Sequence, residues 1–136
     1  PRERVVSAAG ARPPIRWGAV AIGAMAGLVV ALLSFIFLGI SGLVSPDRGE
    51  IFLLFLEFLA LVIAGYVAGR LSEPPELHGG LAGLAAALVT GLLSLTSAGV
   101  PFTALLTLTV VAAALGSAGG VLARWHKDAI QDQSDG

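Results

Sequence analysis

Cysteine and asparagine are both absent from this 136-residue chain, and charged residues make up only 12% of it. Without cysteine there are no disulfides, no thiolate nucleophile and no thiolate metal site. A soluble domain usually has a charged share of about 25%, so this chain has few side chains that favour water. The formal net charge of −1 gives no reason to expect a nucleic-acid partner.

What the chain does have is apolar length, with 56% hydrophobic residues, 18 glycines and a mean hydropathy of +0.89. A soluble domain this small has too much surface to be so apolar, so the lipid bilayer must be part of its solvent. Apolar runs cover residues 15–40, 51–71, 78–96 and 101–125, and each matches a hydrocarbon core of about 30 Å at 1.5 Å per residue.

These runs predict an all-α fold, a four-helix transmembrane bundle that spans residues 15–125. Residues 1–14 and 126–136 are expected to be polar tails, and the second of these to fray at its end. The first run is too long for a cleaved signal peptide and precedes further spans, so we expect it to be retained.

Positive charge gathers on one side of the predicted membrane. The N-terminal tail, the loop after residue 71 and the C-terminal tail hold Arg2, Arg4, Arg12, Arg16, Arg70, Arg124 and Lys127, whereas the other side holds only Arg48. Seven against one predicts that both termini are cytoplasmic and that the protein lies in a plasma or inner membrane. Trp17 and Trp125 would anchor the cytoplasmic interface, together with Arg70 and Arg124.

Two short segments recur in order along the chain. AGLVVAL at 26–32 resembles AGLAAAL at 82–88, and AGYVAGRL at 64–71 resembles AGGVLARW at 118–125, at offsets of 56 and 54 residues. The pattern predicts two copies of one helical hairpin in the same orientation, a parallel repeat. Chance matching among abundant Ala, Gly, Leu and Val is the alternative.

Each predicted span also carries two glycines four residues apart. The pairs are Gly23 and Gly27, Gly65 and Gly69, Gly79 and Gly83, and Gly116 and Gly120. All lie in the predicted cytoplasmic half, and the six phenylalanines lie in the outer half or near the midplane. Small residues let helix backbones approach in lipid, so we expect a bundle that is tight on the cytoplasmic side and wider outside. Most pairs should pack within the chain, with dimerisation as the alternative use.

Glu57 is the one acid inside the 51–71 run. On a helix its direction is shared by Ala60, Ala64 and Ala68, so it should face other helices rather than lipid. It lies roughly 10 Å from the outer end of its span at 1.5 Å per residue. A polar layer is predicted at the same depth on the other spans, formed by Ser34, Thr90, Thr107 and Thr109.

Two interpretations of Glu57 remain open. An acid inside a membrane is costly and marks a functional site by default, so it could bind a proton, a cation or a cationic group. Alternatively, a protonated Glu57 hydrogen-bonds to Thr90 or Thr109 and fixes the bundle. We favour the structural interpretation, because no second acid, histidine or asparagine lies at that depth.

No other pattern predicts chemistry. His78 and His126 are expected at the interface, and no residues have metal-ligand spacing. We find no catalytic residues, no cofactor site and no phosphate loop, so an enzyme is the least favoured class.

GYVAGR at 65–70 and HGGLAG at 78–83 resemble the recurring glycine elements of a family of small uncharacterised bacterial membrane proteins with four spans. The resemblance implies the four-span fold and no activity. From the glycine faces, the short loops and the lack of reactive groups we predict a non-enzymatic accessory or scaffold subunit, forming a homo-oligomer or part of a larger membrane complex. The alternative is a small proton- or cation-linked transporter or channel that uses Glu57.

Overall fold

The computed structural model describes residues 14–41, 46–98 and 101–134. This part of the chain consists of four α-helices without a strand: α1 (Trp17–Ser41), α2 (Pro46–Leu71), α3 (Pro75–Ala98) and α4 (Phe102–Ser134). Each helix contains a stretch that is long and apolar enough to cross a membrane. The predicted all-α class with four apolar spans is therefore confirmed, and the protein has the build of a multi-pass membrane protein in contact with lipid.

Three helices extend beyond the predicted apolar runs by three residues or more. Helix α2 begins at Pro46 instead of residue 51, and α3 at Pro75 instead of residue 78. Proline suits the first helical position, where its missing N–H is not needed. Helix α4 continues past Trp125 to Ser134, so the expected fraying tail is helical over this length. Residues 1–13, which carry Arg2, Arg4 and Arg12, lie outside the described part.

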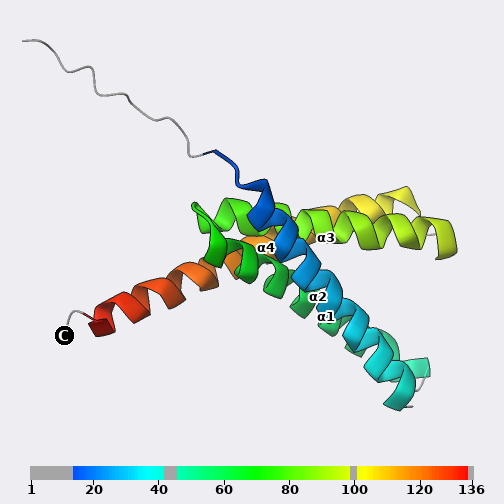
Figure 1. The fold of residues 1–136 in the computed structure, drawn as a ribbon. Helices are drawn as coiled ribbons and strands as arrows, with labels where there is room; N and C mark the ends of the chain where they lie inside the picture. The colour runs from blue at the N-terminus through cyan, green and yellow to red at the C-terminus, as the bar shows by residue number, and fades with distance from the viewer. Residues whose placement is uncertain (1–13, 42–45, 99–100, 135–136) are drawn as a thin grey trace, which may run out of the picture.

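The helices form two consecutive hairpins, α1–α2 and α3–α4 (Figure 1). The hairpins lie together near the end that carries Arg16, Arg70, Arg124 and Lys127, which we call the basic end. They diverge toward the opposite end, the splayed end, where α1 and α3 end and α2 and α4 begin. Helices α2 and α3 contact each other and both outer helices, whereas no described residues of α1 and α4 are in contact.

A bundle that is tighter at one half was expected from the glycine positions, and it is observed (Figure 1). Which side of a membrane the basic end faces stays a prediction, as does the origin of the two hairpins from a parallel repeat.

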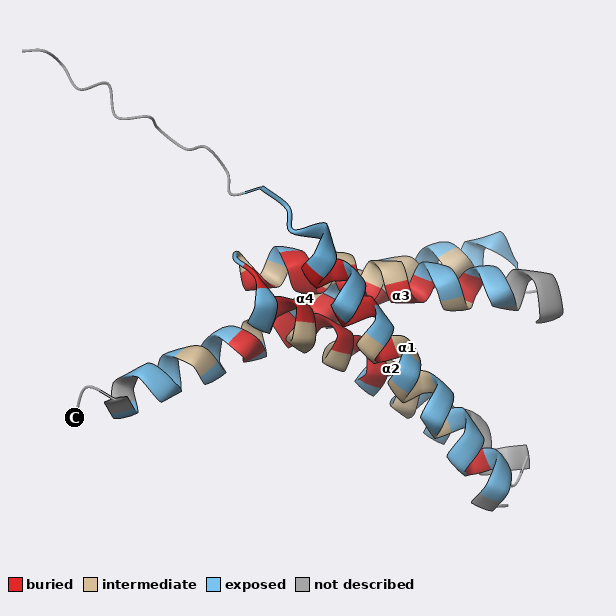
Figure 2. Ribbon diagram, viewed as in Figure 1, coloured by how far each residue is buried: buried red, intermediate tan, exposed pale blue. Residues whose placement is uncertain are grey.

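The centre of the bundle is built from alanine. Ala64, Ala68, Ala82 and Ala112 are fully buried, whereas large apolar side chains such as that of Phe35 are exposed. Figure 2 shows the buried residues gathered where the helices meet and the exposed ones along the diverging parts. A protein in water buries its large apolar residues first. The inverse arrangement is stable only where lipid covers the outer surface, because lipid tails solvate these side chains and small residues let the helices approach.

Backbones of three helices meet at Gly65 of α2, Gly79 of α3 and Gly116 of α4. A Cβ placed on Gly79 would lie 2.5 Å from the carbonyl oxygen of Gly116 and 3.0 Å from that of Gly65. No side chain fits at this point without moving a helix backbone. These glycines therefore determine how closely α2, α3 and α4 pack.

Helix α1 joins the bundle through a similar contact with α2. A Cβ on Gly23 would lie 2.5 Å from the carbonyl oxygen of Ala64, and a Cβ on Gly27 would lie 2.7 Å from the Ala64 Cβ. The remaining glycines of the four pairs also face neighbouring helices: Gly69 faces Gly120 and Ala123, Gly83 faces Ala112 and Gly116, and Gly120 faces Pro75. All four pairs thus contact other helices of the same chain.

Candidate functional site

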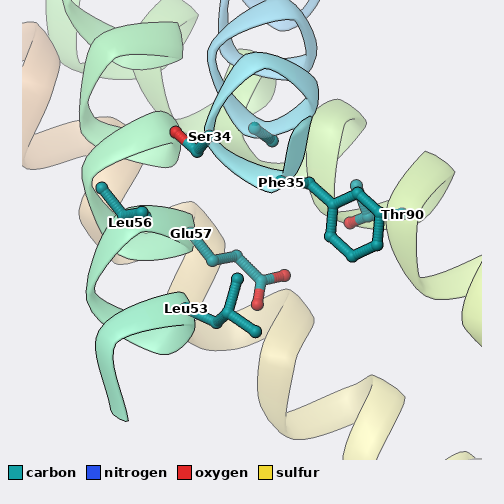
Figure 3. Close-up of a pocket in the computed structure, with 7 residues that line it drawn as sticks. Ser34, Phe35, Leu53, Leu56, Glu57 and Thr90 are labelled. Atoms are coloured by element: carbon teal, nitrogen blue, oxygen red, sulfur yellow. The ribbon is translucent and has the colours of Figure 1, made fainter. Parts of the chain in front are cut away.

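A cavity of about 260 Å³ lies at the splayed end between α1, α2 and α3 (Figure 3). Its walls are Ala31, Ser34 and Phe35 of α1, Leu53, Leu56 and Glu57 of α2, and Thr90 of α3. The cavity brings together three of the residues predicted to form a polar layer: Glu57, Ser34 and Thr90. Glu57 is the one ionisable residue among them.

Helix periodicity explains why Glu57 faces this cavity. Ala64 and Ala60 lie on the α1-facing surface of α2, where the Gly23 and Gly27 contacts hold the two helices together. Following that surface by turns of three and four residues toward the splayed end leads to Glu57 and then Leu53. At these positions the small residues give way to larger ones, and the hairpins separate.

A second, much smaller void adjoins the carboxyl group on its inner side. It has a volume of about 10 Å³ and is lined by Gly27, Leu28, Ala31, Glu57, Ala60, Leu61, Ala86 and Thr90. That is roughly the space of one water molecule. Glu57 therefore lies at the boundary between the open cavity and the closely packed half of the bundle.

The Glu57 carboxyl group forms no hydrogen bond with any other described residue. The Thr90 hydroxyl donates to the carbonyl oxygens of Ala86 and Ala87 on its own helix, each at 3.2 Å. Hydroxyls within membrane helices often bond back in this way. The hydrogen bond that the structural interpretation places between Glu57 and Thr90 or Thr109 is absent from the described structure.

The two α4 threonines of the predicted polar layer lie elsewhere. Thr109 donates to the carbonyl oxygen of Leu105 at 2.7 Å, and Thr107 to that of Thr103 at 3.1 Å. Thr107 lines a separate groove of about 400 Å³ between α2 and α4, with Leu54, Phe58, Ala104, Leu108 and Val111. Thr107 and Thr109 do not line the cavity beside Glu57 because α4 packs against the opposite side of α2 from α1.

The predicted interface anchors lie at the basic end. Trp17 and Trp125 are 66% and 65% exposed, and the Arg70 side chain is exposed as well. Arg124 differs, because its Nη2 atom lies 2.6 Å from Oε1 and 2.8 Å from Oε2 of Glu76. Its guanidinium group therefore pairs with α3 rather than only with carbonyls or headgroups.

His78, which the sequence placed at the interface, is fully buried between helices at the start of α3, and its depth in the membrane stays a prediction. Its Nε2 atom accepts a hydrogen bond of 3.0 Å from the backbone N–H of Arg16. Because Nε2 is the acceptor, Nδ1 carries the proton of a neutral ring and donates to the Pro74 carbonyl oxygen at 2.9 Å. No pattern in the sequence around residue 78 indicates the contact with Arg16, which lies 62 positions away.

The other histidine, His126, is exposed on α4. Its ring meets that of Tyr66 edge to face, with centroids 6.3 Å apart and an angle of 87°. Within residues 14–41, 46–98 and 101–134, no group of three or more His, Asp or Glu side chains is arranged to hold a metal ion.

Comparisons of this chain with protein-family models, with curated proteins and with solved structures found no match.

Proposed function

We propose that the protein is a non-enzymatic membrane module that self-associates, with a second copy of the chain closing its splayed end. Both termini would face the cytoplasm, as the distribution of lysine and arginine predicts. The observation that carries the proposal is the Glu57 carboxyl group, which lines an open cavity and has no hydrogen-bond partner among the described residues.

An unpaired polar group within lipid costs free energy that a hydrogen bond recovers. The hairpins diverge toward the splayed end (Figure 1). The walls of the cavity around Glu57 are mostly apolar side chains such as those of Phe35 and Leu53. In a twofold dimer the same surface meets itself. A second copy would then cover the apolar walls and bring its own carboxyl and hydroxyl groups to Glu57.

The test is the monomer–dimer equilibrium in lipid bilayers, measured by single-molecule photobleaching at several protein-to-lipid ratios. Glu57→Leu removes the polar group and should weaken dimerisation about 5–30-fold, since an interhelical hydrogen bond contributes about 1–2 kcal/mol in model peptides. Glu57→Gln keeps donors and acceptors and should retain most of the affinity.

Thr107→Val is the matched control, because Thr107 lies in the groove between α2 and α4, away from the Glu57 cavity. It should leave the dimer unchanged. Self-association through the splayed end would be refuted if the protein were monomeric at every protein-to-lipid ratio. It would also be refuted if Glu57→Leu and Thr107→Val weakened dimerisation equally.

A second candidate function is cation- or proton-linked transport, and the open space beside the carboxyl group favours it. A carboxylate in such a cavity can accept a proton or a cationic group. Proteoliposomes should then show a proton or cation flux that Glu57→Gln abolishes. If the parent protein and Glu57→Gln give equal fluxes, transport through Glu57 is refuted. If dimerisation also requires a polar side chain at position 57, the self-associating module remains as the function.

A further inference from the structure

A second cavity lies at the basic end, about 370 Å³ in volume and lined by Pro14, Arg16, Arg70, Leu71, Ser72, Glu73 and Lys127. Three cationic side chains reach it from three parts of the chain: Arg16 precedes α1, Arg70 belongs to the last turn of α2, and Lys127 belongs to α4. Glu73 is the one acid in the lining. The charged side chains around the cavity therefore carry a net charge of +2.

Two of the three cations are held in place by the backbone of α2. Arg16 Nη1 donates to the Leu71 carbonyl oxygen at 3.2 Å, and Lys127 Nζ donates to the Gly69 carbonyl oxygen at 3.1 Å. These bonds satisfy carbonyls at the negative end of the helix dipole, which would otherwise repel an anion. Each side chain has further N–H donors available, since guanidinium has five and ammonium three.

The third cation is not used in this way. Arg70 forms no hydrogen bond or ion pair with any other described residue, although its side chain lines the same cavity. By contrast, Arg124 lines a neighbouring cavity where Glu73 and Asp128 balance Arg124 and Lys127, and it is paired with Glu76. Of these two cavities, only the one beside Arg70 has an excess of positive charge among its described lining residues.

The level of the cavity in the membrane indicates the source of the anion. Arg16 directly precedes Trp17, and Lys127 lies two residues after Trp125. Both tryptophans are exposed, and exposed tryptophans of membrane helices mark the level of the lipid headgroups. At that level the phosphate of a lipid headgroup would lie within reach of the three cations.

We propose that this cavity binds a phosphate group, supplied by the headgroup of an anionic phospholipid. Arg16 and Lys127 contact the phosphate oxygens from fixed positions, and Arg70 completes the site from the edge of the cavity. Arginine and lysine are the side chains that bind phosphate through charge-assisted hydrogen bonds. The proposal does not depend on the function of Glu57, which lies at the other end of the bundle.

The experiment measures equilibrium binding of fluorescent phosphatidylglycerol to the full chain in micelles of a neutral detergent. Arg70→Gln should raise the dissociation constant about fivefold, which corresponds to about 1 kcal/mol for one cation near an anionic lipid. Adding Lys127→Gln should raise it further. Arg124→Gln removes the same charge outside the cavity and should leave the dissociation constant unchanged.

Competition distinguishes the sources of phosphate. Unlabelled phosphatidylglycerol should displace the probe, whereas phosphatidylcholine, whose ammonium group cancels its charge, should compete weakly. If inorganic phosphate displaced the fluorescent probe at the same concentrations as the unlabelled lipid, the cavity would be a phosphate site. The proposal that a lipid supplies the phosphate would then be wrong. Equal effects of Arg70→Gln and Arg124→Gln would show only diffuse attraction to the basic end and overturn the site.

Discussion

The contact between Gly79 and Gly116 gives the sharpest test of how the bundle holds together. A Cβ on Gly116 would press on the carbonyl group of Gly79 and lie 3.0 Å from the Cα atom of Gly83. Carbon atoms normally approach to about 3.5–4.0 Å, so α3 and α4 must move apart by roughly half an ångström to an ångström. Backbone atoms on both sides cannot give way as a flexible side chain would.

Gly116→Ala should therefore destabilise the protein by about 1–3 kcal/mol, the usual cost of overpacking a well-packed contact. Intrinsic helix propensity acts in the other direction, since alanine favours a helix by up to about 1 kcal/mol over glycine. A measured loss would thus come from the steric contact. The assay is reversible unfolding in mixed micelles by titration with sodium dodecyl sulfate, followed by the fluorescence of Trp17 and Trp125.

Gly18→Ala is the matched control, because a Cβ on Gly18 would meet no atom within 4 Å. Its free energy of unfolding should stay within about 0.5 kcal/mol of the parent or rise slightly. Gly65→Ala should weaken the bundle as Gly116→Ala does, since its Cβ would meet the Gly116 carbonyl, and the double variant should lose less than the sum. Equal stability of Gly116→Ala and Gly18→Ala would refute the reasoning.

Two further predictions concern the buried histidine and the topology. His78→Ala leaves the Arg16 backbone N–H without its acceptor and should reduce the free energy of unfolding by about 1–3 kcal/mol in the same titration. An unfolding midpoint equal to that of the parent would contradict the role assigned to the His78 ring. Because the chain lacks cysteine, Phe102→Cys and Gln133→Cys provide single thiols without further changes. A membrane-impermeant maleimide should label Phe102→Cys in intact cells and Gln133→Cys only after permeabilisation, and labelling of both from the same side would refute the predicted topology.

The helices could be predicted from the sequence because length and apolar content decide whether a segment spans a bilayer. Their ends could not, because a span ends at the lipid boundary whereas a helix ends where its hydrogen bonding stops. Pro46 and Pro75 start helices before the apolar runs begin, and α4 extends into the polar residues up to Ser134.

The site was predictable only in part, since depth along a helix can be counted but the direction that a residue faces within the bundle cannot. Ser34 and Thr90 share a cavity with Glu57, whereas Thr107 at similar depth lines another groove. The side of α2 on which α4 packs decides which of the two cavities a hydroxyl residue lines. Gly119 of α4 lies against the backbone of Val62 and Tyr66, and no glycine pattern reveals that choice in advance.

The hydrogen bond between His78 and the backbone of Arg16 joins residues 62 positions apart. The backbone N–H of Arg16 is therefore synthesised before the His78 ring, and α1 and α2 lie between the two residues in the chain. The entrance to α1 is therefore completed only when the start of α3 arrives.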